Sequence, residues 1–267
     1  MTISPDPSHS SVGLRGRVLE RLLWTLNSLA DEMRPIGAGW IVRTRSLPMV
    51  WTLNQLRITE SAVAADVVSW ADTYQGDLPY RHVVVEDDAT AHRLESALVA
   101  ENWKLDREVL MALTALPNRE VDTKRVIELA EEEMLGLMRR WITEEHSDIA
   151  AGGLDQLEEY NRREGTLWNE RCFGVLGGNG DPAAVTKLRY VGSTAWVEDV
   201  YTVPEERRRG FARMLVTHAT ELARSAEHDL TFIIADDHDW PKHLYEAIGF
   251  RPIGWTWSFH RAVDRSS

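Results

Sequence analysis

The residues whose type and spacing most clearly suit them to bind a ligand are four arginines within seven positions: Arg207, Arg208, Arg209 and Arg213. A β-branched stretch and Pro204 precede them, and the apolar periodicity after them predicts a helix from Gly210 to about Ser225. A helix start carries unpaired backbone N–H groups and a partial positive charge, so it binds phosphate readily. Gly210 has no Cβ, which lets a bulky anion approach the backbone. The segment predicts a phosphate site, although a solvated helix start would show the same run of charges.

Two strings in this half of the chain carry a family resemblance. Residues 207–212 (RRRGFA) are similar to the Arg/Gln-x-x-Gly-x-Gly/Ala signature of the GNAT acyltransferases. Residues 244–250 (LYEAIGF) are similar to that family's Leu-Tyr-x-x-x-Gly-Phe element, and they follow the first string by a strand and a turn, as in the family. The order of elements from about residue 121 to 260 also fits. The resemblance implies an acyltransferase that uses acetyl-CoA and no metal.

What the resemblance implies for the donor can be assigned to numbered residues. The family's cofactor lies in a V-shaped opening between two parallel strands, one of which is 196–203 here. Backbone groups of Val200, Tyr201 and Thr202 would pair with the pantetheine arm. The residues implied in holding the pyrophosphate are Arg207, Arg208, Arg209, Gly210, Phe211, Ala212 and Arg213.

Acyl transfer to an amine also needs a proton donor for the leaving thiolate and a proton acceptor for the amine. Tyr245 matches the family tyrosine that protonates the sulfur; a tyrosine at the edge of the core would look the same. For the base we choose Glu198, with Asp199, Asp236 and His238 left open. Strand alternation sends Glu198 and Asp199 to opposite faces, so only one can point at the acceptor. A bulge in the strand would shift which one.

Composition limits the partners and the location. The chain has 267 residues and a formal net charge of −12, which argues against nucleic acid or an anionic membrane as the main partner. Acidic residues are frequent in the helices expected within 123–165, which suits a cationic amine, although a solvated helix face explains them equally well. The single cysteine, Cys172, excludes an internal disulfide, and no signal peptide is visible, so we expect a cytoplasmic protein.

Periodicity predicts the elements that must position these residues. In the first half we expect strands at 39–45 and 48–58, among others, and helices at 61–74 and 89–101. In the second half, apolar residues from Ile127 to Trp141 predict a helix, followed by a helix at 153–163. The string GGNGD at 177–181 predicts a hairpin turn, and Gly249 is expected to end a helix.

The two halves end alike, with a strand, Asp-Asp, a helix and a strand, which predicts a repeat. We expect an α/β (α+β) fold of two tandem GNAT-like domains, each a mixed, mostly antiparallel sheet flanked by helices. The ranges are a disordered segment at 1–11, a degenerate domain at 12–117 and a catalytic domain at 118–267, a layout similar to tandem GNAT proteins. The first half has no RxxGxA string, and Leu98 stands where the repeat places Tyr245.

Two functions are compatible with these residues. The first is an N-acyltransferase that moves an acetyl group directly from acetyl-CoA to a small-molecule or peptide amine. The second is a non-catalytic acyl-CoA-binding or sensing protein with the same fold. Tyr245 and the carboxylates of strand 196–203 favour the first. The acceptor and the oligomeric state, a homodimer included, stay open.

Overall fold

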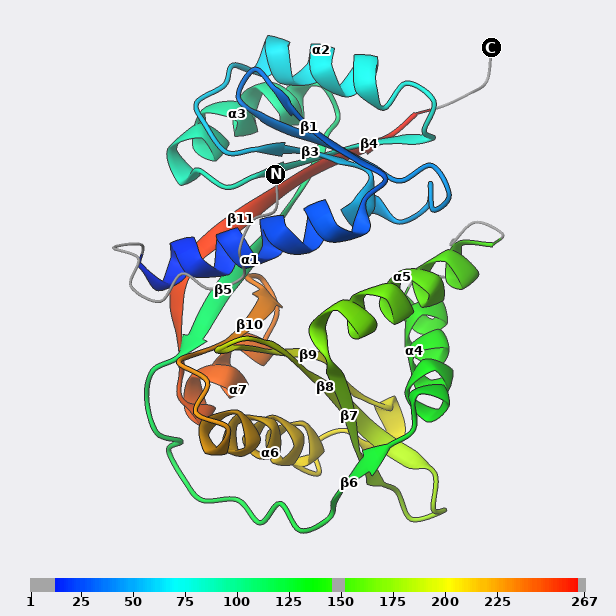
Figure 1. Cartoon of the computed structure of the whole chain (residues 1–267), viewed down its shortest axis with the longest axis vertical. Coiled ribbons are helices and arrows are strands. Elements are labelled where there is room, and N and C mark those ends of the chain that lie inside the picture. Colours follow the sequence, from blue (N-terminus) through cyan, green and yellow to red (C-terminus); the bar gives the residue numbers. More distant parts are fainter. Residues whose placement is uncertain (1–12, 146–151, 264–267) are drawn as a thin grey trace. The chain divides into compact units, whose positions relative to one another are not determined.

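The computed structural model describes residues 13–145 and 152–263, which divide into two compact units (Figure 1). Of the described residues, the C-terminal unit combines 13–18 with those in Leu110–Ala235 and Asp239–Ile253. The N-terminal unit combines Leu19–Val109, Asp236–His238 and the residues from Gly254 onward. The segment 1–11, predicted to be disordered, lies outside the described residues. The predicted boundary after residue 117 falls in a loop and stays a prediction.

The first half of the chain supplies most of the N-terminal unit. Its elements are α1 (Leu14–Leu29), β1 (Glu32–Ile36), β2 (Gly39–Arg43), η1 (Trp51–Leu53), β3 (Gln55–Ile58), α2 (Ala64–Tyr74), β4 (Tyr80–Val85), α3 (Asp88–Ala100) and β5 (Lys104–Leu113). The strand order in this unit is β1-β2-β3-β4-β11-β5, where β11 is the last strand of the chain, Phe250–Ala262. β3 and β4 are parallel, and β4 pairs with β11 in antiparallel fashion.

The core of the N-terminal unit lies between its sheet and the helices α2 and α3. Buried side chains of the strands, such as Ile58 and Val83, pack with Val67 of α2 and Leu94 of α3. The Asp87 side chain accepts a hydrogen bond from the Thr90 backbone at 2.7 Å and so caps α3.

The C-terminal unit holds the rest of the elements. They are β6 (Val126–Leu129), α4 (Glu131–Glu145), α5 (Gly153–Trp168), β7 (Glu170–Leu176), β8 (Pro182–Val191), β9 (Thr194–Thr202), η2 (Pro204–Glu206), α6 (Phe211–Ser225), β10 (Leu230–Asp236) and α7 (Pro241–Ile248). The strand order is β11-β5-β10-β9-β8-β7-β6. The strands from β6 to β9 are antiparallel, whereas β9 and β10 are parallel. The predicted mixed α/β class is confirmed.

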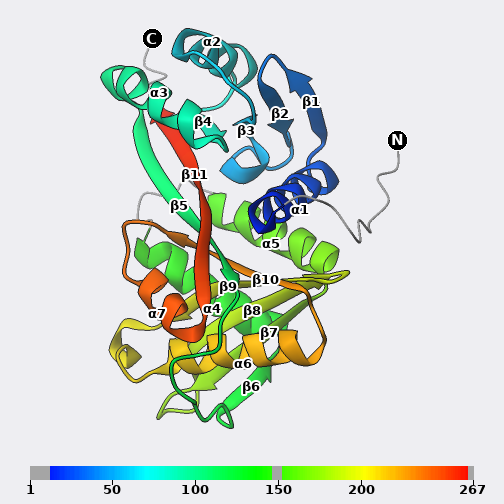
Figure 2. The ribbon, with the colours of Figure 1, turned by 90° about the vertical axis from the view of Figure 1, so that its left-hand side faces the viewer.

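The helices of the C-terminal unit cover both faces of its sheet. Figures 1 and 2 show α6 on one face of strands β7–β9, with α4 and α5 on the other. α6 buries an apolar face that includes Phe211, Leu215 and Ala219, the pattern expected of an amphipathic helix on a sheet. α7 packs beside α6 and ends at Gly249, whose φ of 119° is the left-handed cap that the sequence predicts.

Three elements differ from the sequence predictions. The predicted strand 48–58 is a strand only from Gln55, because the side chain of Asn54 bonds the Leu47 and Val50 carbonyls and closes a turn. The apolar pattern predicts a helix that includes Ile127, but this residue lies in β6, paired with Gly174 of β7, and the helix begins at Glu131. Strand β1 was missed; its Pro35 suits the edge position that β1 holds in its unit.

No helix in the described ranges has both the length and the apolar content needed to cross a membrane.

Candidate active site

The arginine-rich loop joins β9 to α6 in a strained conformation. Arg208 has φ of +65° and Gly210 has φ of +83°, and α6 begins directly after them at Phe211. A left-handed arginine is uncommon and typical of functional loops. A Cβ added at Gly210 would meet nothing within 4 Å, so the space beside the loop is open. The loop therefore offers exposed backbone at a helix N-terminus with room for a bulky anion.

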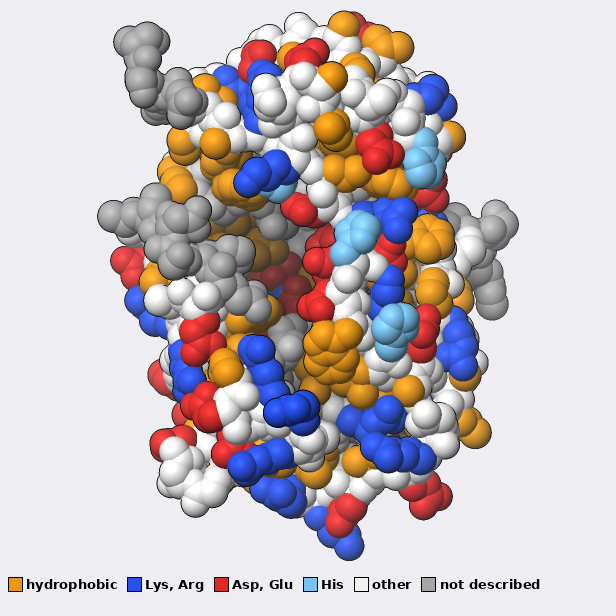
Figure 3. Space-filling model, turned by 180° about the vertical axis from the view of Figure 1, so that it is seen from behind, with side chains coloured by type: hydrophobic (Ala, Val, Ile, Leu, Met, Phe, Trp, Pro, Cys, Tyr) orange, Lys and Arg blue, Asp and Glu red, His pale blue; other side chains and the backbone are white. Residues whose placement is uncertain are grey.

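The positive charge of this region is only partly neutralised. Arg209 pairs with Glu206 at 2.7 Å, and the Arg207 Nε donates to the Thr202 carbonyl at 3.0 Å. Among the described residues of this region, the arginines without a carboxylate partner are Arg119, Arg207, Arg208 and Arg213. Figure 3 shows Lys and Arg side chains gathered on one face of this unit.

Arg119 is a contributor that sequence reasoning missed. Burial and the nearby Arg119 lower the pKa of Arg213, whose Nη1 donates to the Asn118 side chain at 3.1 Å. The loop after β5 therefore brings a further cation to the start of α6. Nothing in the sequence indicated this, since a lone arginine in a polar linker carries no positional signal.

The parallel strands β9 and β10 separate next to this loop. In the described chain their pairing covers only Thr194–Trp196 with Leu230–Phe232, although β9 continues to Thr202. On its other edge β9 stays paired with β8 as far as Thr202. The side chain of Tyr201 is engaged elsewhere, donating to Glu144 at 2.7 Å and stacking on Trp141. From Val197 onward the β10-side edge of β9 is thus available to pair with an extended ligand.

Tyr245 lies on α7 with 6% of its surface exposed, in edge contact with Phe250. Burial, with the nearby Asp239, raises the pKa of its hydroxyl above the ordinary value of 10.0. The hydroxyl therefore keeps its proton at neutral pH. This is the protonation state that a proton donor needs.

A bulge in β9 changes the geometry of the two candidate bases. Lys187 of β8 stands opposite Glu198, and Val185 stands opposite Tyr201, so β9 has one extra residue in this interval. Asp199 takes up the extra residue with φ of +52°. The expectation that Glu198 and Asp199 point to opposite faces is therefore wrong: both reach the side chains of neighbouring basic residues on β8.

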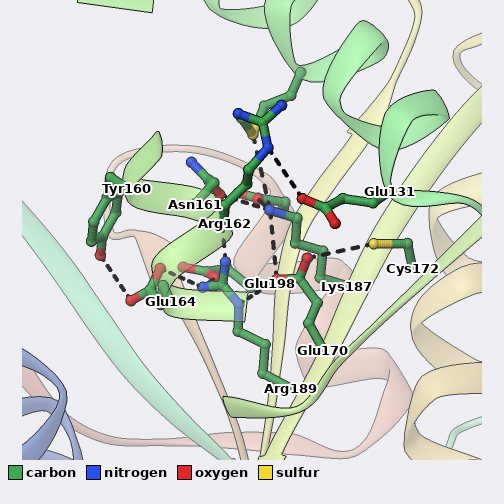
Figure 4. Close-up of polar contacts among 12 residues, drawn as sticks. Glu131, Tyr160, Asn161, Arg162, Glu164, Glu170, Cys172, Lys187, Arg189 and Glu198 are labelled. Carbon is green, nitrogen blue, oxygen red and sulfur yellow. Dashed lines mark hydrogen bonds and ion pairs between the residues drawn. The ribbon is translucent and has the colours of Figure 1, made fainter. Parts of the chain in front are cut away.

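Those basic residues, Lys187 and Arg189, organise a charged cluster on the α5 face of the sheet (Figure 4). The Lys187 Nζ lies 2.8 Å from Asp199, 2.7 Å from the Asn161 amide oxygen and 3.7 Å from Glu170. The Arg189 guanidinium lies 2.6 Å from both Glu164 and Glu170, and it also pairs with Glu198. Lys187 and Arg189 are 1% and 0% exposed, so both cations of this cluster are buried.

The cluster separates the acidities of its two β9 carboxyls. Burial raises the pKa of Glu198 well above 4.5; Arg189 opposes the rise, and Glu164 and Asp199 add to it. Burial would also raise the pKa of Asp199, but Lys187 and Arg189 outweigh it and hold that pKa below 3.8. Glu198 therefore holds its proton far more tightly than its neighbour Asp199.

The remaining candidates are not members of this cluster. Asp236 and His238 are exposed, and Asp237 between them pairs with Arg107. Burial raises the pKa of the Cys172 thiol to about 12, which suits an inert core residue. In the described ranges no group of three or more His, Cys, Asp or Glu side chains is arranged to hold a metal ion.

The N-terminal unit has a counterpart of the loop but not of its chemistry. Its parallel strands β3 and β4 are joined through α2, as β9 and β10 are joined through α6. The loop before α2, residues 59–63 (TESAV), has a glutamate and no arginine or glycine. Leu98, at the place matching Tyr245, is fully buried in the core.

Comparison with known proteins agrees with this geometry. The acetyltransferase (GNAT) family matches residues 136–250, from α4 to the start of β11. A functionally unknown conserved protein from Staphylococcus epidermidis has a similar structure, with a TM-score of 0.67, 11% identity, and coverage of 88% of this chain and 95% of that one. A GCN5-related N-acetyltransferase from Kribbella flavida has a TM-score of 0.60, 16% identity, and coverage of 94% and 96%.

These identities speak for fold alone, and no curated protein sequence matches the chain. The matched segment contains the β9–β10 opening, the arginine-rich loop and the tyrosine helix. Residues 136–250 of the chain are therefore similar to the acetyltransferase (GNAT) family.

Proposed function

We propose that the protein is an N-acyltransferase that transfers an acetyl group from acetyl-CoA directly to a small-molecule or peptide amine. The observation that carries the proposal is the separation of β9 from β10 beside a glycine- and arginine-rich helix start. An unpaired strand edge suits the amide-bearing pantetheine arm, and the loop suits its pyrophosphate. The single reduced Cys172 is in keeping with a cytoplasmic enzyme.

The binding roles follow from the positions of the residues. Backbone groups of Val200, Tyr201 and Thr202 would pair with the pantetheine arm. Backbone N–H groups from Arg208 to Arg213 would hold the pyrophosphate, and the arginines without carboxylate partners would neutralise its charge. When bound, the thioester supplies an activated acetyl group.

The chain's own groups would then move two protons. As the amine nitrogen bonds to the acetyl carbon, its proton passes to the Glu198 carboxylate, directly or through water. As the carbon–sulfur bond breaks, the Tyr245 hydroxyl protonates the departing thiolate. Exchange with solvent returns both groups to their starting states. The arrangement requires Glu198 to be ionised and Tyr245 to be protonated before each turnover.

A thiol-release assay with acetyl-CoA and a panel of amines tests the proposal. We expect amine-dependent release that falls strongly in Tyr245→Phe. Tight CoA binding without release on any amine would instead support an acyl-CoA-binding protein that has lost the chemistry.

A further inference from the structure

The two carboxylates of β9 receive very different shares of positive charge. Asp199 has Lys187 as a close partner at 2.8 Å, and the other carboxylate near that ammonium, Glu170, is farther away at 3.7 Å. Glu198 shares the Arg189 guanidinium with Glu164 and Glu170. Arg189 is thus divided among three carboxylates, whose next cation, Lys187, is more distant and lies closest to Asp199.

Exposure distinguishes the three carboxylates around Arg189. The Glu164 side chain is 3% exposed, and the Glu198 side chain is 27% exposed. Glu164 therefore meets the guanidinium from the buried side, and Glu198 meets it from the side that solvent can reach. Only a carboxylate with such access can exchange a proton with an entering amine.

Resting on the N-acyltransferase function proposed above, we propose that Glu164 is a positioning residue that engages Arg189 from the buried side and so leaves Glu198 basic enough to take the acceptor's proton. Lys187 holds Asp199 as the permanently ionised neighbour. Glu164 thus acts through Arg189 and does not touch the acceptor.

The charged and titratable groups that face Glu198 come from several elements: Lys187 and Arg189 on β8, Glu170 on β7, Tyr160 and Glu164 on α5, and Asp199 on β9. Glu164 and Asp199 raise the pKa of Glu198, in addition to burial, whereas Arg189 and Lys187 lower it. Loss of the Glu164 charge should therefore let Arg189 act more fully on Glu198 and lower its pKa.

Glu164→Gln is a mild way to remove that charge. Arg189 keeps Glu170 and Glu198, so the variant leaves no buried cation unpaired. The Gln amide oxygen can still accept from Arg189, and the amide NH2 at the position of the other Glu164 oxygen can donate to the Tyr160 hydroxyl. A matched control is Glu159→Gln on the same helix, where Glu159 pairs with Arg163 at 2.8 Å. Glu170→Gln is a second test variant, because Glu170 also occupies Arg189.

The first measurement is the pH dependence of kcat/KM, whose acid limb reports an ionisation of the free enzyme. We expect the limb to move to lower pH by about one unit in Glu164→Gln, since an opposite charge at this range lowers a carboxyl pKa by roughly 1–3 units. Glu170→Gln should move it in the same direction, and Glu159→Gln should leave it in place. A limb that stays in place or moves upward in Glu164→Gln overturns the inference.

The second measurement does not depend on activity. In protein carrying ¹³C at the glutamate carboxyl carbons, the signal lost in Glu198→Gln identifies Glu198 and can be titrated. We expect a pKa above the ordinary glutamate value in the wild type and a lower one in Glu164→Gln. If the protein acetylates an amine but the pKa of Glu198 is the same in Glu164→Gln as in the wild type, the inference is overturned and the proposed function stands. A moved titration in a protein that acetylates no amine supports the coupling to Glu164 and overturns the proposed function, the proton-transfer role included.

Discussion

Arg189→Gln tests the electrostatic organisation of the site through stability. The substitution removes the guanidinium that lies 2.6 Å from both Glu164 and Glu170 and also pairs with Glu198. The Glu164 carboxylate, 3% exposed, would remain buried without its cation. Removing one partner of a buried ion pair costs about 3–5 kcal/mol, a large share of the roughly 5–15 kcal/mol that stabilises a typical domain. We expect a folded but strongly destabilised variant at pH 7.

Urea unfolding followed by tryptophan fluorescence measures this loss. Arg189 lies 5.4 Å from the centre of the Trp196 ring, and Trp168 packs against Trp196, so two of the eleven tryptophans lie beside the substituted residue. The double variant Arg189→Gln/Glu164→Gln removes the stranded carboxylate with the cation. It should regain about 0.5–3 kcal/mol relative to the sum of the single variants, the usual coupling between contacting residues. Strictly additive losses would refute the reasoning.

The stability lost in Arg189→Gln should also depend on pH, and the direction of this dependence follows from the pKa of Glu198. The pKa of Glu198 is already raised in the folded protein, and loss of Arg189 raises it further. Between the folded-state pKa of Glu198 in the wild type and its higher folded-state pKa in the variant, the folded variant holds a proton that the folded wild type has released. Its free energy of unfolding, relative to the wild type, should therefore fall as pH rises through that window and recover as pH falls.

Three further outcomes follow from the site. Tyr245→Phe should lower kcat by roughly 10²–10⁴-fold, which is the usual contribution of a proton donor. The Kd for CoA, measured by calorimetric titration, should not change. An unaltered kcat would show that Tyr245 is not the proton donor. Gly210→Val should weaken CoA binding by roughly tenfold. The φ of +83° costs a β-branched residue about 1–2 kcal/mol, and about 1.4 kcal/mol corresponds to a factor of ten in affinity. Equal affinities of the variant and the wild type for CoA would contradict the proposed role of the loop. Cys172, whose pKa burial raises to about 12, should resist a disulfide thiol reagent at pH 8 in the folded protein and react fully in denaturant; rapid labelling of the native protein would show that the strand opens.

The sequence was most informative where local chemistry decides the conformation. The glycine at the start of α6, the Gly249 cap and the turn at 177–181 need particular backbone geometries, and each occurs where the residue types indicate. The apolar stripe of α6 and the β-branched β9 were equally direct. The start of α6 and strand β9 are the elements to which we assign the binding of acetyl-CoA.

The sequence was least informative where distant segments decide the outcome. The bulge at Asp199 depends on the register between β8 and β9, which the alternation within β9 does not reveal. The role of Glu164 depends on Arg189, 25 residues further along the chain. The sequence contains no signal for this cluster, because the alternation of Lys187 and Arg189 with Leu188 and Tyr190 is also the pattern of a strand with one solvated face.

Direct transfer is the central claim, and the fate of a labelled acetyl group tests it most directly. The enzyme is mixed with acetyl-labelled acetyl-CoA and an excess of cationic amines, quenched in acid within one turnover, and separated into protein, donor and amine. We expect the label to move from the donor to an amine, with none retained by the protein and about 10²-fold slower transfer in Tyr245→Phe. Label that stays on the donor with every amine, or label bound to the protein, would contradict the claim.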